Sequence, residues 1–172
     1  MKKISFINVV FIISSVFLFI GCPYNSEVSI DPVPSVPVIK DLYGIWAEND
    51  SASKRYVIKP ENDYVYTIDE LQLNSSKSNY EQYTSYSAFL SNLDGTIFLN
   101  VKEKEGSDNI FFSPNYYFYK LQVFKDSIIL TPVTEYIREK FDNSSDLRLF
   151  FSTNMKNSYF FAQDQKYFRI TQ

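Results

Sequence analysis

The stretch that decides the fold is residues 80–101, which read YEQYTSYSAFLSNLDGTIFLNV. Asp94-Gly95 in this stretch is a dipeptide that favours the tight primed turn of a two-residue hairpin loop. A run rich in Tyr and Ser precedes it, and Ile97, Leu99 and Val101 follow it with period two. The pattern predicts two antiparallel strands joined by a tight turn.

Similar patterns lie on both sides of this hairpin. A second hairpin is predicted around the turn sequence Pro-Glu-Asn-Asp at residues 60–63. A third is predicted around Asp126, which lies between alternating apolar residues at 117–123 and 128–130. The domain is therefore expected to be built mainly from hairpins.

Helical spacing replaces the alternation after the third hairpin. Thr134 is a candidate N-cap for a short helix that runs through Phe141, and Asn143 or Ser144 is a candidate N-cap for another. The second helix would carry four apolar residues on one side: Leu147, Phe150, Phe151 and Met155. Two short helices are thus expected before the end of the chain.

The chain is predicted to end in one more hairpin, with Phe168 and Ile170 facing inward from the last strand. Counted together, the patterns predict about eight or nine short strands. That number favours a mainly β fold, an antiparallel up-and-down barrel or a strongly curved sheet, with two short helices before the last hairpin. Residues 41–172 are assigned to this domain.

The residue composition excludes several kinds of chemistry. The chain has no His, a common general base and metal ligand, and Cys22 is its only cysteine. An internal disulfide and a zinc–cysteine cluster are therefore ruled out, and no cofactor or metal is expected. Loss of Lys2 and Lys3 with a leader would reduce the 17 basic residues to 15 against 20 acidic ones, a net charge of −5. Nucleic acid is therefore not expected as a partner.

The first 21 residues have the layout of a secretory signal peptide. Lys2 and Lys3 precede an apolar run at residues 4–20, and no basic residue follows the run as a stop signal. A permanent membrane-spanning helix is the alternative, because about 17 apolar residues can just span a bilayer. The residues that follow favour the signal peptide.

Leu18-Phe19-Ile20-Gly21-Cys22 resembles the lipobox of bacterial lipoproteins. The resemblance implies a diacylglyceryl group on the Cys22 thiol, cleavage before Cys22, and a further fatty acyl chain on the new amino group. Two or three acyl chains give stable membrane attachment. Because Pro23 follows, where Asp would resemble an inner-membrane retention signal, the outer membrane of the cell envelope is the expected location.

Residues 22–40 are predicted to form a tether between the lipidated cysteine and the domain. Prolines at positions 23, 32, 34 and 37 remove backbone donors and favour extended, polyproline-like chain. A proline-rich docking ligand is the functional alternative for this segment.

Gly44-Ile45-Trp46, at the head of the first predicted strand, resembles the Gly-x-Trp signature of lipocalins and lipocalin-like bacterial lipoprotein domains. In that family the Trp plugs the closed end of the barrel and an arginine near the end of the chain packs over it. Arg169 is the candidate for that arginine. The resemblance implies a structural, barrel-closing role for Gly44, Trp46 and Arg169, and a lipocalin-like fold.

Two functions remain open from the sequence. The first is a lipid-anchored barrel that binds a small apolar or aromatic-stacking ligand, because the chain has 14 Tyr that could line a cup. The candidate lining residues are Tyr80, Tyr83, Tyr86, Tyr116, Tyr117 and Tyr119. The second is a structural or interaction protein of the envelope, with a filled barrel and a protein or glycan partner.

Enzymatic activity is not expected. The acidic pairs Asp69 with Glu70 and Glu103 with Glu105 are interpreted as solvated acids of turns or loops. The serines of the polar loops have no histidine to activate them. The sequence therefore favours binding or interaction over catalysis.

Overall fold

The computed structural model describes residues 23–76, 79–104 and 115–171, so the predicted signal peptide and Cys22 lie outside the described part. Its strands are β1 (Asn25–Ser26), β2 (Gly44–Ala47), β3 (Lys54–Pro60), β4 (Val65–Leu73), β5 (Tyr80–Leu93), β6 (Thr96–Glu103), β7 (Tyr116–Val123), β8 (Ser127–Pro132) and β9 (Gln165–Arg169). A 3-10 turn, η2 (Lys40–Leu42), precedes β2, and helix α2 (Ser144–Asn154) precedes β9. No helix in these ranges is long and apolar enough to cross a membrane.

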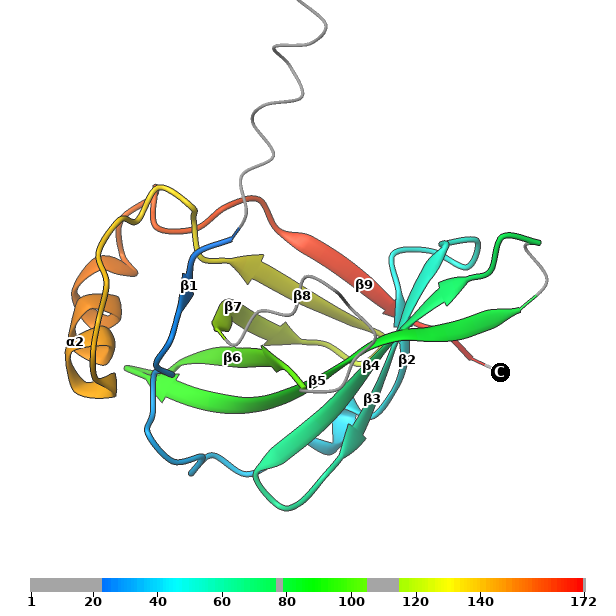
Figure 1. The fold of residues 1–172 in the computed structure, drawn as a ribbon, viewed down its shortest axis with the longest axis horizontal. Helices are drawn as coiled ribbons and strands as arrows, with labels where there is room; N and C mark the ends of the chain where they lie inside the picture. Colours follow the sequence, from blue (N-terminus) through cyan, green and yellow to red (C-terminus); the bar gives the residue numbers. More distant parts are fainter. Residues whose placement is uncertain (1–22, 77–78, 105–114, 172) are drawn as a thin grey trace, which may run out of the picture.

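Strands β2 to β9 form a closed antiparallel barrel of eight strands (Figure 1). Each strand pairs with the next along the chain, β2 also pairs with β9, and the β7–β8 pairing completes the ring. The prediction of a mainly β, up-and-down barrel is therefore confirmed. Strand β1 is added to the free part of the β7 edge, outside the ring.

The turn at Asp94-Gly95 follows from its sequence. Both residues have positive φ, 50° for Asp94 and 85° for Gly95, as the primed turns require. The Asn92 side chain accepts a hydrogen bond from the Gly95 N–H at 2.9 Å. Beyond the turn β5 and β6 pair from Leu93 with Thr96 to Tyr86 with Glu103.

Successive side chains of each strand point to opposite faces of the barrel wall, so two separate hydrophobic clusters form, one on each face. The interior cluster contains the inward-facing residues, among them Trp46, Tyr66 and Leu99. The outer cluster lies between the barrel wall, the N-terminal segment and α2, and its buried members are Tyr24, Ile30, Leu93, Phe98, Phe118, Val133, Leu147, Phe151 and Phe160. Figure 1 shows α2 at the outside of the barrel, apart from the strands that enclose the interior.

Of the two predicted helices, the second is present and the first is not. Helix α2 begins as predicted: the side chain of Asn143 accepts a hydrogen bond from the Asp146 N–H at 2.9 Å, which caps the helix. Residues 134–141 are not helical. The Thr134 N–H instead donates to the Phe160 carbonyl at 3.0 Å, so long-range pairing overrides the local helical spacing.

The predicted inward face of the last strand is also wrong. Phe168 is exposed, whereas Tyr167 faces the interior cluster. Only one regular strand, β9, occurs there, and Phe161 makes an isolated bridge with Val133. Because alternation places Arg169 on the same face as Tyr167, the arginine can reach the closed end of the barrel.

The predicted tether is corrected for the described residues 23–40, because part of this segment packs on the barrel. Tyr24 is buried, and Asn25 and Ser26 pair with β7. Ile30 is fully buried in the outer cluster. The four prolines limit regular structure here, yet the apolar residues between them dock the segment as a strap.

Candidate functional site: a tyrosine-lined cavity

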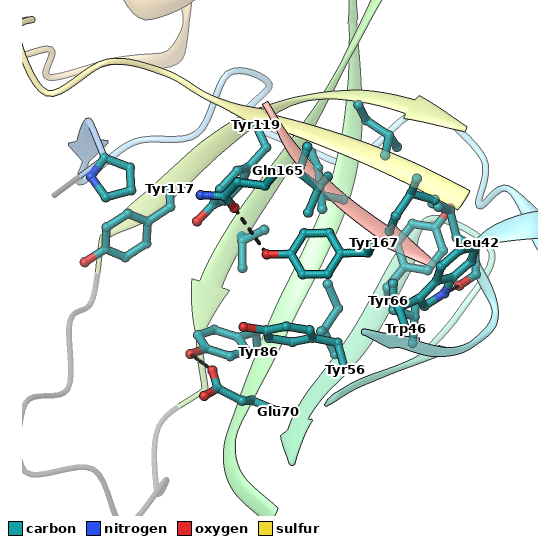
Figure 2. A pocket seen from close by; sticks show the side chains of 18 of the residues that line it. Leu42, Trp46, Tyr56, Tyr66, Glu70, Tyr86, Tyr117, Tyr119, Gln165 and Tyr167 are labelled. Carbon is teal, nitrogen blue, oxygen red and sulfur yellow. Dashed lines mark hydrogen bonds between the residues drawn. The ribbon is translucent and has the colours of Figure 1, made fainter. Parts of the chain in front are cut away.

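The barrel interior holds a cavity of about 410 Å³ (Figure 2). This volume lies in the range of sites that take one small organic molecule. All eight barrel strands contribute apolar, aromatic or polar residues to the lining, and Leu42 of η2 and Pro23 add to it. The lining residues are Pro23, Leu42, Trp46, Tyr56, Ile58, Tyr66, Ile68, Glu70, Tyr86, Leu99, Val101, Glu103, Tyr117, Tyr119, Leu121, Ile128, Leu130, Gln165 and Tyr167. The part of the barrel that the structure describes is therefore hollow.

One end of the cavity is closed by Trp46 and Leu42. Both side chains are buried, and the Trp46 indole N–H donates to the Leu42 carbonyl at 2.8 Å. The Arg169 guanidinium lies over the Trp46 ring, 4.5 Å from its centroid, and donates to the carbonyls of Tyr43 at 2.5 Å and Asp41 at 2.6 Å. This cation–π contact and its hydrogen bonds tie η2, β2 and β9 together.

Gly44 permits that closure. Its φ is +133°, and a Cβ added there would lie 2.8 Å from Nη1 of Arg169. The structure thus brings together the three residues for which the lipocalin resemblance implies a closing role, Gly44, Trp46 and Arg169.

The opposite end is open as far as the described residues show it. Gln165 is exposed and Tyr117 is half-buried, in contrast to the buried Trp46. Figure 2 shows Tyr117 and Gln165 at the end of the cavity far from Leu42 and Trp46. The cavity therefore opens past Tyr117 and Gln165.

Five tyrosines form the aromatic wall between the two ends: Tyr56, Tyr66, Tyr86, Tyr119 and Tyr167. Burial raises the pKa of Tyr66 and of Tyr167 to about 12. Burial is also the main cause that raises the pKa of Tyr56, Tyr86 and Tyr119, and in each case the Glu70 charge adds to it. These five phenols therefore stay protonated and uncharged near neutral pH.

The hydroxyls of this wall differ in their partners. The Tyr66 hydroxyl accepts a hydrogen bond from the Ile39 N–H, and the Tyr167 hydroxyl donates to Gln165 at 3.2 Å. The hydroxyls of Tyr56 and Tyr119 make no hydrogen bond to another described residue. Neither hydroxyl oxygen is a buried atom without a partner, so both are accessible from the cavity and can bind water or a polar group of a ligand.

Two carboxylates lie in the wall, and the interpretation of both as solvated loop acids is wrong. Glu70 on β4 is 5% exposed and Glu103 on β6 is 8% exposed, and both line the cavity. Glu70 accepts hydrogen bonds from Tyr86 at 3.2 Å and Gln72 at 2.9 Å, and pairs with Lys54 at 2.9 Å. The alternation that points Glu70 inward was visible in the sequence, but its burial follows only from barrel closure.

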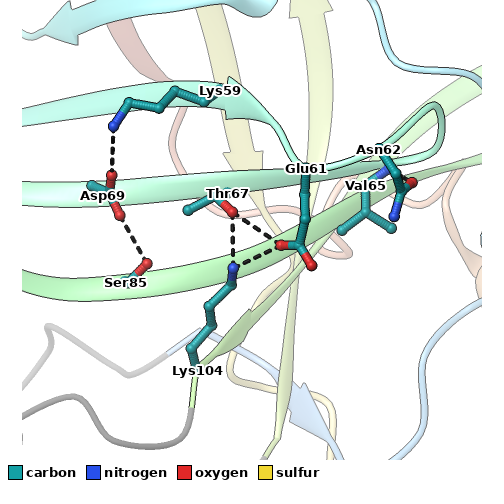
Figure 3. A network of polar contacts seen from close by, with 8 residues as sticks. All are labelled: Lys59, Glu61, Asn62, Val65, Thr67, Asp69, Ser85 and Lys104. Atoms are coloured by element: carbon teal, nitrogen blue, oxygen red, sulfur yellow. Dashed lines mark hydrogen bonds and ion pairs between the residues drawn. The ribbon is translucent and has the colours of Figure 1, made fainter.

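Asp69, the neighbour of Glu70, points to the outer face of β4 but is only 8% exposed, so the interpretation as a solvated loop acid is wrong for it too, while Glu105 lies outside the described residues. Asp69 accepts hydrogen bonds from Lys59 at 3.1 Å and Ser85 at 2.8 Å, and Figure 3 shows this outer network together with the pair of Lys104 and Glu61. Two hydrogen bonds, from Lys104 and Thr67, lower the pKa of Glu61. Asp69 and Glu70 therefore lie on opposite faces and cannot work on one substrate as an acid and base pair.

The other predicted tyrosines divide between the cavity and the outer surface. Tyr86, Tyr117 and Tyr119 line the cavity, as do Tyr56, Tyr66 and Tyr167, which were not among the predicted lining residues. Tyr80 lies outside it, where its hydroxyl donates to the Ala52 carbonyl at 2.6 Å and its ring stacks on Arg55.

Tyr83 also lies outside the cavity and is 50% exposed. The β4–β5 register shifts between Glu70 and Leu71, which leaves Tyr83 as the unpaired extra residue of a β-bulge. Tyr116 packs on Phe89 of the outer wall.

The alternation of residues along each strand places Tyr56, Tyr66 and Tyr167 on the same face as other inward residues. Closure of β2 on β9 is needed to bring these three tyrosines together.

No protein-family model, curated protein or solved structure matches this chain. The lipocalin resemblance therefore rests on the closed barrel and on Gly44, Trp46 and Arg169. The interpretation of the cavity rests on the geometry of its own residues.

Proposed function

We propose that this protein is a lipid-anchored lipoprotein of the bacterial cell envelope whose barrel binds one small, mostly apolar molecule and does not catalyse a reaction. The observation that carries the binding function is the cavity of about 410 Å³ inside the barrel, with Trp46 at its closed end. A filled barrel would favour the alternative, an interaction protein. The lipobox resemblance at Leu18–Cys22 supports the anchor, with the outer membrane as its location.

The wall chemistry defines the ligand further. Its aliphatic and aromatic side chains suit an alkyl or ring body, and the hydroxyls of Tyr56 and Tyr119 suit one polar group. The described lining residues include Glu70 and Glu103 but neither Lys nor Arg. Lys54, which is not a lining residue, pairs with Glu70 at 2.9 Å and offsets part of its charge. Because no cationic side chain faces the cavity among the described lining residues, the site favours neutral or cationic molecules over anions.

Fluorescence of Trp46, the only tryptophan, tests this function directly because its ring lies in the cavity wall. Titration with dodecanol, dodecylamine or dodecanoate should give saturable binding of one molecule per chain, with dodecanoate weakest. Val101→Phe adds a phenyl ring to the cavity wall, which obstructs the space for a ligand, and should abolish the signal. Gln122→Phe adds the same ring to an exposed site on the outside of β7 and should leave binding unchanged. Equal titrations of the two variants would contradict the proposal.

Glu70→Gln separates the charge argument from the shape argument. Loss of this carboxylate should lower the affinity for dodecylamine by about tenfold, because a hydrogen bond to a charged group contributes about 1.5 to 3 kcal/mol. The affinity for dodecanol should change by less than about twofold, since this neutral molecule needs no charged partner. An unchanged preference among the three probes would show that Glu70 does not select the ligand.

A further inference from the structure

The N-terminal strap determines where the chain leaves the domain. Asn25 and Ser26 pair with Tyr117 and Tyr116 at the beginning of β7. The Tyr24 N–H donates to the Val133 carbonyl at 3.0 Å, and the Tyr24 side chain is 6% exposed. The backbone just after position 23 is thereby fixed to the barrel edge.

Contacts further along hold the strap in the same place. Ile30 is fully buried, and its N–H donates to the Asn100 side chain at 3.0 Å. Asp31 forms an ion pair with Arg148 of α2. Release of the strap would expose the buried side chains of Tyr24 and Ile30 to water, which is unfavourable.

Pro23 lies at the cavity itself. It lines the cavity together with Tyr117, and Tyr117 lies at the open end, far from Trp46 (Figure 2). One trans peptide step spans about 3.8 Å between Cα atoms, so a lipid on residue 22 would begin within a few ångströms of the cavity wall.

We infer that the lipid on Cys22 holds the open end of the cavity against the bilayer, and that the barrel takes its ligand, a membrane-dissolved amphiphile, directly from the lipid. The inference rests on the proposed function for both the anchor and the binding. Passage through water would expose every CH₂ group of the ligand's alkyl chain, which is unfavourable in proportion to the chain length. A mouth on the membrane surface removes that barrier for a molecule with a long alkyl chain.

Fluorophores on introduced cysteines test the orientation. Lipidation consumes the Cys22 thiol, so one introduced cysteine is the only free thiol of the mature chain. Gln165→Cys labels the open end, and Lys40→Cys labels an exposed position of η2 beside the closed end. Both labelled, lipidated proteins are reconstituted in phosphatidylcholine vesicles that carry a nitroxide on the lipid headgroup.

The label at 165 should be quenched several-fold more than the label at 40. Equal quenching, or stronger quenching at 40, would overturn the orientation even if Trp46 titrations still report binding. Failure of both proteins to sediment with vesicles would instead disprove the anchor. Absence of dodecanol binding by the detergent-free protein would disprove the binding function, so each failure is recognisable.

A spacer variant tests the consequence for ligand transfer. Twelve Gly and Ser residues inserted between Cys22 and Pro23 would add a flexible link of about 19 Å root-mean-square length. The variant should stay on vesicles and lose the difference in quenching. Transfer of dodecylamine from vesicles to the barrel should slow several-fold, with unchanged affinity in solution. An unchanged transfer rate would contradict direct uptake from the bilayer.

Discussion

The two hydrophobic clusters on either face of the barrel wall use different aromatic residues. Among the described residues, the interior cluster has Tyr and Trp as its aromatic members and no Phe. The buried aromatic residues of the outer cluster are Phe98, Phe118, Phe151 and Phe160 together with Tyr24. A phenyl ring suits a dry, filled contact, and a phenol suits a surface that meets polar groups. The difference teaches that α2 and the strap stabilise the barrel from outside, which leaves the interior free to remain hollow.

The largest expected effect is in the outer cluster. Phe151 of α2 lies 5.1 to 5.5 Å, centroid to centroid, from the rings of Phe98, Phe118 and Phe160. Phe151→Ala should lower the free energy of unfolding by about 3 to 5 kcal/mol, measured by urea denaturation, because it leaves a cavity in a packed contact. Leu149→Ala, at an exposed site of the same helix, should cost less than about 0.5 kcal/mol.

The affinity of the folded Phe151→Ala protein for dodecanol should stay within about twofold of wild type, since the wall between the clusters remains. Loss of binding in proportion to the loss of stability would contradict the separation of the two clusters.

The next effect is at the closed end. Gly44→Ala should cost about 2 to 3 kcal/mol, because a side chain at φ +133° is strained and its Cβ would displace Arg169. Gly95→Ala, where no atom lies within 4 Å of the added Cβ, should cost only about 1 to 2 kcal/mol. Thermal unfolding measures both. A Gly44→Ala protein as stable as Gly95→Ala would show that Arg169 does not need this close approach.

The interior should also respond to alkaline pH. Burial raises the pKa of Tyr66 in the folded protein to about 12, against a reference value of 10.0. The contribution of the protonated phenol to the free energy of unfolding is therefore complete below pH 10 and is lost as the pH rises from 10 toward 12. Urea denaturation of wild type and Tyr66→Phe should show that their stability difference falls by about 1 kcal/mol between pH 10 and pH 11. A difference that does not change over this interval would refute the assignment of a buried, protonated phenol.

The smallest effect on stability, and a selective one on binding, is expected at Tyr119. Its hydroxyl makes no hydrogen bond to another described residue, so Tyr119→Phe should change the free energy of unfolding by less than about 0.5 kcal/mol. The affinity for dodecanol should fall about three- to tenfold, the worth of one hydrogen bond. Tyr83→Phe, at an exposed bulge position, should alter neither quantity.

Local patterns were enough to predict much of the barrel. The turn at Asp94-Gly95, the alternation of Ile97, Leu99 and Val101, and the cap at Asn143 all act within a few residues, and each appears in the structure. The confirmed barrel follows from such local preferences repeated along the chain.

Features that depend on long-range pairing were missed. The bulge that turns Tyr83 outward is visible only once β4 and β5 are paired. Glu70 and Glu103 are buried only because the sheet closes around them, and Tyr24 is buried only because the strap adds to β7. The ring centroids of the cavity residues Tyr56 and Tyr167 lie 5.6 Å apart, and only the closure of β2 on β9 brings them this close. None of these features can be predicted from a short stretch of the sequence.

Native mass spectrometry tests the central claim, a hollow interior that holds one ligand, most directly. The lipidated protein would be released from vesicles that contain dodecanol and dodecylamine, beside its Val101→Phe variant. The account predicts one bound amphiphile per wild-type chain and none in the variant. A wild-type chain without an added mass, or the same added mass on Val101→Phe, would contradict it.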